Sequence, residues 1–167
     1  LDAVAQMNLD YQMQDPDTAS IETYFKPRAA GANLVFVLAT KDPLGNCTNG
    51  IIRHNTPLTV WDRTATTNYG SNNFIYTGTT SGKWDPKKYL NIYVVKDIYT
   101  GSTGGGIIVG YTMLPNTVSA GNKQDAIVYN YSFLGAANKD VRSLEHEIGH
   151  WLGLPHTFGN ANSAGTT

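Results

Sequence analysis

The sequence predicts a single α+β domain over residues 1–167, in which a helix, several strands and a second helix follow one another. Three observations support this order. Apolar residues recur three and four positions apart in residues 1–14 and again from residue 139 onward. Between these stretches lie apolar segments of strand length that are rich in valine, isoleucine and tyrosine. The chain of 167 residues is long enough to bury one hydrophobic core.

The first helix is predicted over residues 1–14, and the Asp-Pro-Asp sequence at 15–17 should end it. Its apolar face is made by Leu1, Val4, Met7 and Tyr11. A buried strand that ends in a turn is predicted at 32–46, and further strands are predicted at 87–98, 107–115 and 125–135. Residues 62–83 are rich in threonine, asparagine, glycine and serine, which predicts a long surface loop.

The last helix is predicted from residue 139 onward by a change of apolar period. Its apolar face is made by Val141, Leu144, Ile148 and Leu152. Asn138 or Asp140 can cap its start, because both side chains accept hydrogen bonds from free backbone amides. Gly153 can end the helix in a left-handed conformation, and Pro155 prevents its continuation.

The composition argues against several classes of partner. The net charge is −1 and no basic patch is visible, so a nucleic-acid partner is not expected. No apolar run has the length of a membrane span, so membrane insertion is not expected either. Cys47 is the single cysteine, which excludes a disulfide within the chain. The chain begins at Leu1 without a signal peptide, which predicts a processed start or a piece of a longer protein. The oligomeric state is not predicted.

The most informative motif lies on the last predicted helix. His146 and His150 are four residues apart, so both rings project from one side of the helix and can reach one point. A turn at Gly153 can bring His156 to the same point as a third ligand. The resulting pattern is His-Glu-x-x-His-x-x-Gly-x-x-His. From average residue usage, roughly one in a hundred thousand chains of this size would contain it by chance. It predicts one zinc ion held by three histidines with an open position for water.

Glu147 is not expected to bind the metal. Such a carboxylate takes a proton from the water that attacks a peptide carbonyl and gives it to the leaving amine. The first hypothesis is therefore a zinc endopeptidase, with zinc polarising the carbonyl. A second is a zinc-binding but non-catalytic binding or adhesion domain. A third is a metal-free, β-rich binding module in which the motif is accidental.

The sequence also resembles the metzincin metallopeptidases of the pappalysin type. The stretch HEIGHWLGLPHTF is similar to the zinc helix of that family and the segment after it. WDPKKYLNIYVV at 84–95 resembles its central strand, and DPLGNCTNGIIR at 42–53 resembles the turn after its second strand. NLDYQMQDPD at 8–17 is similar to the end of its first helix. The resemblance runs along nearly all of the chain.

This resemblance implies a metzincin-like (zincin) N-terminal subdomain, with a twisted, mixed, mostly parallel sheet backed by two long helices. It also implies an antiparallel edge strand that forms the upper rim of the cleft and pairs with an extended substrate. By position, the substrate-binding residues of that strand are Gly110, Tyr111, Thr112 and Met113. Members of the family are typically secreted endopeptidases that act on proteins or peptides.

The chain departs from the family after the third histidine. Metzincins place a methionine-containing turn downstream of that ligand, whereas Met7, Met13 and Met113 all precede His146. The resemblance therefore implies that the C-terminal subdomain, with its S1′ pocket and any calcium site, is largely absent. The expectation is a fragment of a longer chain that holds the N-terminal subdomain and the start of the C-terminal one.

Overall fold

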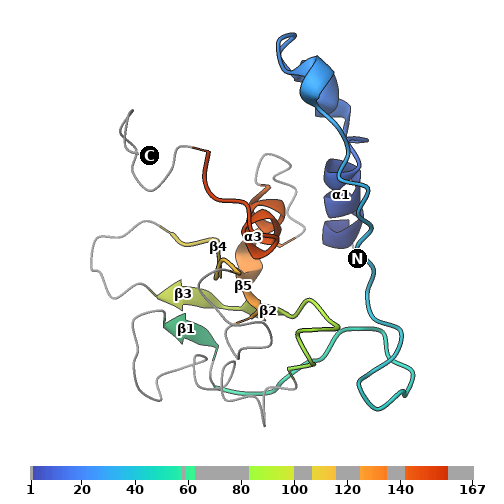
Figure 1. The fold of residues 1–167 in the computed structure, drawn as a ribbon. Helices are drawn as coiled ribbons and strands as arrows, with labels where there is room; N and C mark the ends of the chain where they lie inside the picture. The colour runs from blue at the N-terminus through green and yellow to red at the C-terminus, as the bar shows by residue number, and fades with distance from the viewer. Residues whose placement is uncertain are drawn as a thin grey trace.

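The computed structural model describes residues 2–57, 59–62, 83–99, 107–115, 125–134 and 142–157. The predicted α+β order is confirmed in these residues (Figure 1). The helices are α1 (Asp2–Tyr11) and α3 (Ser143–Trp151). The strands are β1 (Val60–Asp62), β2 (Ile92–Val95), β3 (Asp97–Tyr99), β4 (Gly110–Thr112) and β5 (Ile127–Asn130). Short 3-10 turns lie at Pro16–Ser20, Lys26–Arg28 and Tyr131–Phe133.

The strands form two small sheets. In the larger one β5 lies in the middle, parallel to β2 and antiparallel to β4. The register pairs Ile92 of β2 with Ile127 of β5, and Gly110 of β4 with Tyr129 of β5. The smaller sheet pairs β1 with β3 in parallel. The sheet is therefore mixed, with β4 at one end of its strand order.

Strand β5 forms the centre of the hydrophobic core because both of its faces are covered. Successive side chains of a strand point to opposite faces. Ile127 and Tyr129, which are 0% and 1% exposed, pack on the α3 side with Met7, Leu144 and Ile148. Val128 points to the other face and packs there with Val95 and Ile98. The strand that precedes α3 is thus held on both sides.

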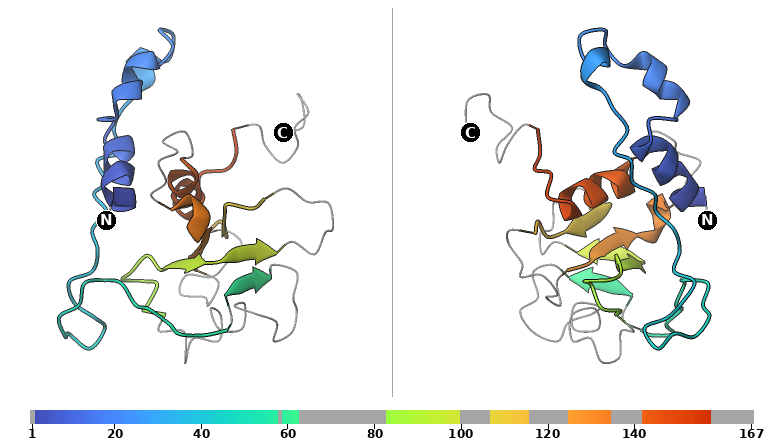
Figure 2. Two further views of the ribbon diagram at one scale, coloured as in Figure 1. Left: turned by 180° about the vertical axis from the view of Figure 1, so that it is seen from behind. Right: turned by 45° about the vertical axis from the view of Figure 1, so that its right-hand side comes forward.

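Helix α3 crosses one face of the larger sheet, and α1 stands beside α3 (Figure 2). Helix α1 presents the predicted apolar stripe to this core, with Met7 buried and Val4 and Tyr11 packed around it. The Tyr11 hydroxyl donates a hydrogen bond to the backbone carbonyl of Glu145 at 3.1 Å. The first helix therefore supports the helix that carries the histidines. None of the described helices is both long and apolar enough to cross a membrane.

Arg142, just before α3, forms the ionic link between the two helices. Its Nη2 atom lies 3.3 Å from Asp10 Oδ1, 3.1 Å from Asp15 Oδ1 and 2.6 Å from Asp17 Oδ2. The Asp10 side chain is only 7% exposed, and burial raises the pKa of its carboxyl while Arg142 opposes the rise. Because a buried carboxylate needs a partner, this arginine ties the start of α3 to the end of α1.

The segment 32–46 differs from its prediction as a strand. Residues 29–39 form neither helix nor strand, Asn33 has a left-handed φ of 54°, and no described strand pairs with this stretch. The Asn8 side chain instead bonds both backbone groups of Phe36, donating to its carbonyl at 2.9 Å and accepting from its amide at 2.7 Å. A side chain from α1 thus supplies the hydrogen bonds that a neighbouring strand would supply.

Helix α1 ends at Tyr11 rather than at residue 14. Most of the predicted surface loop, at 63–82, lies outside the described residues. Helix α3 begins at Ser143 with Arg142 at its N-cap position, so the prediction of a helix that starts at residue 139 with Asn138 or Asp140 as its cap is wrong.

Candidate metal centre

Two of the three histidines project from the open face of α3. The helix buries Leu144, Glu147 and Ile148 against the sheet and α1. His146 and His150 lie on another side, His146 exposed and His150 partly buried. Their four-residue spacing places the two rings one above the other, with centroids 4.4 Å apart. The predicted arrangement of these two side chains is present.

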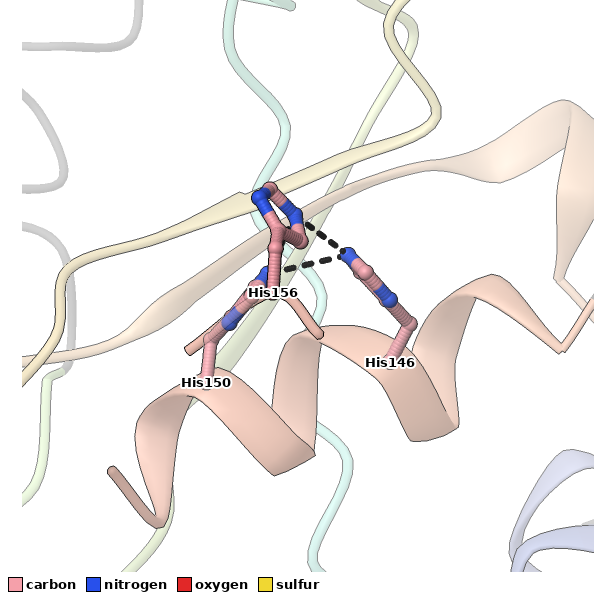
Figure 3. Close-up of side chains that lie close together, drawn as sticks. All are labelled: His146, His150 and His156. Atoms are coloured by element: carbon pink, nitrogen blue, oxygen red, sulfur yellow. Dashed lines mark hydrogen bonds between the residues drawn. The ribbon is translucent and has the colours of Figure 1, made fainter. Parts of the chain in front are cut away.

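The third histidine is brought to the same point by the way the helix ends. Gly153 has a φ of 97°, a left-handed conformation that a glycine adopts at little cost. Its amide donates to the His150 carbonyl at 2.8 Å, and the Leu154 amide donates to the Gly149 carbonyl at 2.9 Å. These two bonds define a Schellman motif, which reverses the chain after the last turn of a helix. The chain then passes Pro155 and places His156 over α3 (Figure 3).

The three imidazoles converge through the same ring atom. The Nε2 atom of His150 lies 2.9 Å from that of His146 and 3.0 Å from that of His156. The remaining pair, His146 and His156, is 3.2 Å apart. Three nitrogens bound to one tetrahedral ion at about 2 Å would lie roughly 3.3 Å from one another. The three nitrogens therefore fit a single metal ion.

The tautomer of His150 also suits a metal ligand. Its Nδ1 atom lies 2.7 Å from the Leu154 carbonyl oxygen. A carbonyl can only accept, so Nδ1 carries the proton and Nε2 keeps a lone pair. A hydrogen bond of this kind orients the rings of metal-binding histidines. For His146, the loss of part of its hydration and the two neighbouring rings lower the pKa, which also favours the neutral ring.

Glu147 precedes His150 by three residues on α3, so the two are neighbours on the helix surface, and Glu147 is 8% exposed and packs against β4. Burial raises the pKa of its carboxyl to about 7, although His150 and the Thr112 backbone amide both act against the rise. A backbone group that lowers the pKa of a carboxyl is a donor, so the Thr112 N–H donates to the Glu147 carboxylate. The carboxylate is therefore held between α3 and β4.

The four residues predicted to bind substrate form β4 and its continuation. The Asn130 amide donates to the Val109 carbonyl at 2.8 Å, so these two residues are a hydrogen-bonded pair. Such pairs alternate along antiparallel strands, so the backbone N–H and C=O groups of Gly110 and Thr112 point away from β5. The side chains of Tyr111 and Met113 lie together, with the Tyr111 hydroxyl 2.7 Å from the Met113 sulfur. Tyr111 packs beside Val128, on the sheet face opposite α3.

Within the described part of the chain, no aspartate, glutamate or cysteine joins the three histidines as a ligand. The histidines border a cavity of about 580 Å³ that is also lined by Tyr11, Ala30 and Ala32. His54 is exposed and lies outside this group. The contacts of Leu154 with His150 and of Thr112 with Glu147 could not be predicted from the sequence. Both involve backbone atoms, which carry no residue-specific pattern.

Comparison with solved structures places the fold near mirolysin. The mature mirolysin of Tannerella forsythia, in complex with a cleaved peptide, aligns with a TM-score of 0.74 and 26% identity, covering 99% of this chain and 60% of that one. Mirolysin in complex with compound 9 aligns with a TM-score of 0.72 and 26% identity, covering 95% and 57%. This likeness supports the predicted metzincin-like fold.

Comparison of sequences identifies the family. An extracellular metalloprotease of Colletotrichum graminicola is 33% identical over 76 residues, or 41% of this chain and 25% of that protein. The aligned region thus spans about a quarter of this curated relative. Residues 70–167, more than half of the chain, match the family described as pregnancy-associated plasma protein-A. The chain therefore belongs to the pregnancy-associated plasma protein-A family of peptidases, Peptidase_M43.

Proposed function

We propose that the full-length protein is a zinc-dependent endopeptidase whose metal ligands and catalytic carboxylate lie on this chain. The observation that carries the proposal is the convergence of three Nε2 atoms within 3.2 Å of one another, on the helix that also holds Glu147. Family membership and the extracellular metalloprotease relative support the same reaction class.

The proposed zinc ligands are His146, His150 and His156. Neutral imidazole is a good ligand for zinc, and a set of three protein ligands leaves a position open for water, as catalytic sites require. When bound, zinc supplies Lewis acidity, which lowers the pKa of a water and polarises a substrate carbonyl. The hydrogen bond from His150 Nδ1 to Leu154 holds its ring ready for this role.

Glu147 is the proposed general base and acid. It takes a proton from the water that attacks the peptide carbonyl and then gives it to the leaving amine. Its carboxylate is buried and held by the Thr112 amide, so few orientations are open to it. A carboxylate fixed in this way is already oriented for proton transfer, so little side-chain entropy is lost when the reaction begins.

The proposed substrate is an extended peptide that adds to the outer edge of β4, which includes Gly110, Tyr111, Thr112 and Met113. The N–H and C=O of Gly110 and the C=O of Thr112 point away from β5, the direction from which such a strand would approach, whereas the Thr112 N–H donates to Glu147. The mature mirolysin structure was solved with a cleaved peptide, which supports a peptide as the class of substrate. The extracellular relative supports secretion of the full-length protein.

The proposal is tested by measuring zinc content and peptide cleavage in the full-length protein and in its Glu147→Gln variant. We expect one zinc per chain in both proteins. Cleavage of an unfolded protein substrate should fall by about 10²–10⁴-fold in the variant, because the side chain keeps its shape but loses its basicity.

Glu145→Gln is the matched control, since it makes the same change two residues earlier on the α1 side of α3. It should retain zinc and activity. A zinc-loaded wild-type protein that cleaves no peptide library would support a non-catalytic binding domain instead. Purified protein without any metal would favour a metal-free binding module.

A further inference from the structure

Gly110 lies directly against Glu147, and the space between them is too small for any side chain at position 110. A Cβ atom built on Gly110 would lie 2.6 Å from Glu147 Cγ and 3.1 Å from Glu147 Cδ. Both distances are well below ordinary van der Waals separation. Gly110 is not among the residues with positive φ, so its backbone does not require glycine. The requirement for glycine here comes from Glu147.

The neighbours of Gly110 leave no easy way to relieve this contact. The same Cβ atom would lie 3.1 Å from Cδ2 of Tyr129, which is 1% exposed and part of the core. The Glu147 atom most affected is Cγ, in the stem of the side chain rather than at its tip. Relief would therefore require either a different rotamer of Glu147 or a shift of β4 away from α3. Either change would separate the carboxylate from the Thr112 amide that holds it.

We propose that Gly110 is a positioning residue for Glu147, in addition to any contact that β4 makes with substrate. By lacking a side chain, it lets the stem of Glu147 lie flat on β4 and lets the carboxylate reach the amide of Thr112. This inference rests on the proposed function, because the positioned group is the proposed general base. Its structural part, the close packing of Gly110 against Glu147, can be tested independently of activity.

The kinetic test compares Gly110→Ala with Gly149→Ala in the full-length protein. Gly149 is a buried glycine of the same helix as Glu147, but a Cβ there would meet only ordinary contacts, at 3.7 Å to Leu154 and 3.9 Å to Tyr11. For Gly110→Ala we expect kcat to fall by about tenfold to a hundredfold with unchanged zinc content, because the base is displaced. Gly149→Ala should keep kcat within about twofold, since alanine is favoured over glycine inside a helix.

A stability test uses Glu147 itself as the second site. The Glu147→Ala change removes Cγ and Cδ, the closest atoms that the new Cβ would meet. Gly110→Ala should therefore lower the Tm by several degrees in the wild-type background and by less than half as much in the Glu147→Ala background. A change that merely weakened β4 would lower the Tm equally in both backgrounds.

Equal losses of Tm in the two backgrounds would overturn the proposal, and so would a wild-type kcat in Gly110→Ala. If the wild-type protein cleaves no substrate, the proposed function fails. In that case the two-background comparison of Tm still decides whether Gly110 accommodates Glu147.

Discussion

The Nδ1 atom of His150 lies 2.7 Å from the carbonyl oxygen of Leu154, so the segment that follows α3 holds a ring that the helix itself carries. Leu154 reaches this place because Gly153 turns the chain with a φ of 97°. The same turn carries His156 back over α3. One backbone conformation therefore places the third histidine and also sets the tautomer of the second.

This dependence predicts the effect of Gly153→Ala. A non-glycine residue in the left-handed conformation costs about 1–2 kcal/mol, so the free energy of unfolding should fall by that amount. Because His156 and the Leu154 carbonyl both depend on the turn, zinc affinity should fall by about 10–100-fold. Chemical denaturation and titration against a zinc chelator measure the two effects.

Gly45→Ala is the control for backbone strain. Gly45 has a φ of 89°, and nothing lies within 4 Å of the position its Cβ would take. This variant should lose a similar amount of stability while keeping zinc affinity. If Gly153→Ala binds zinc as tightly as wild type, the turn does not place the third ligand.

A second prediction concerns the ligands. His156→Ala should reduce bound zinc to a small fraction of one per chain after dialysis against a weak chelator, because two histidines bind far more weakly than three. His54→Ala makes the same change at an exposed histidine outside the convergent group. It should keep full zinc content by elemental analysis. Equal zinc loss in both variants would mean that the metal is not held by the convergent histidines.

The convergence of the three histidines was predictable from the sequence because its determinants are local. The four-residue spacing of His146 and His150 and the glycine turn before His156 are all read within eleven residues. The structure places these rings together as that spacing predicts. The burial of Glu147 was not predictable, because it depends on β4, which lies more than thirty residues earlier in the chain.

The fold was predictable in its order of elements but not in its pairing. The apolar run of β5 and the apolar stripes of α1 and α3 appear in single windows of sequence. Pairing depends on a partner elsewhere in the chain. The backbone of Phe36 is hydrogen-bonded by the Asn8 side chain, and no periodic pattern of apolar residues in the sequence predicts this partner.

A third prediction concerns the link between the helices. Arg142→Gln removes the cation that faces Asp10 and Asp15, whose side chains are 7% and 15% exposed. Since Arg142 is itself 39% exposed, the expected loss in the free energy of unfolding is about 1–3 kcal/mol, below that of a fully buried pair. Urea denaturation near neutral pH measures it.

Asp17→Asn is the matched control for this link, because the Asp17 side chain is 58% exposed and its pairing is open to solvent. It should cost less than about 1 kcal/mol. A loss as large as that of Arg142→Gln would place the main interaction of the arginine at Asp17 rather than at the buried carboxylates.

The final prediction is a loss of stability at high pH that depends on Tyr11. Burial, with a smaller contribution from the charge of Glu145, raises the pKa of Tyr11 from 10.0 to about 12 in the folded protein. A folded-state pKa above the unfolded one means that folding favours the protonated phenol. The contribution of the Tyr11 phenol to the free energy of unfolding is fully present below pH 10.0 and is lost as the pH rises toward about 12.

The free energy of unfolding should therefore fall over this range, and it should fall less steeply in Tyr11→Phe. Burial also raises the pKa of Tyr129, so some of the slope should remain in the variant. Tyr24→Phe, at a tyrosine that is 68% exposed, should keep the wild-type slope. Urea denaturation at a series of pH values compares the three proteins. Equal slopes in wild type and Tyr11→Phe would show that the Tyr11 phenol ionises as freely in the folded chain as in the unfolded one.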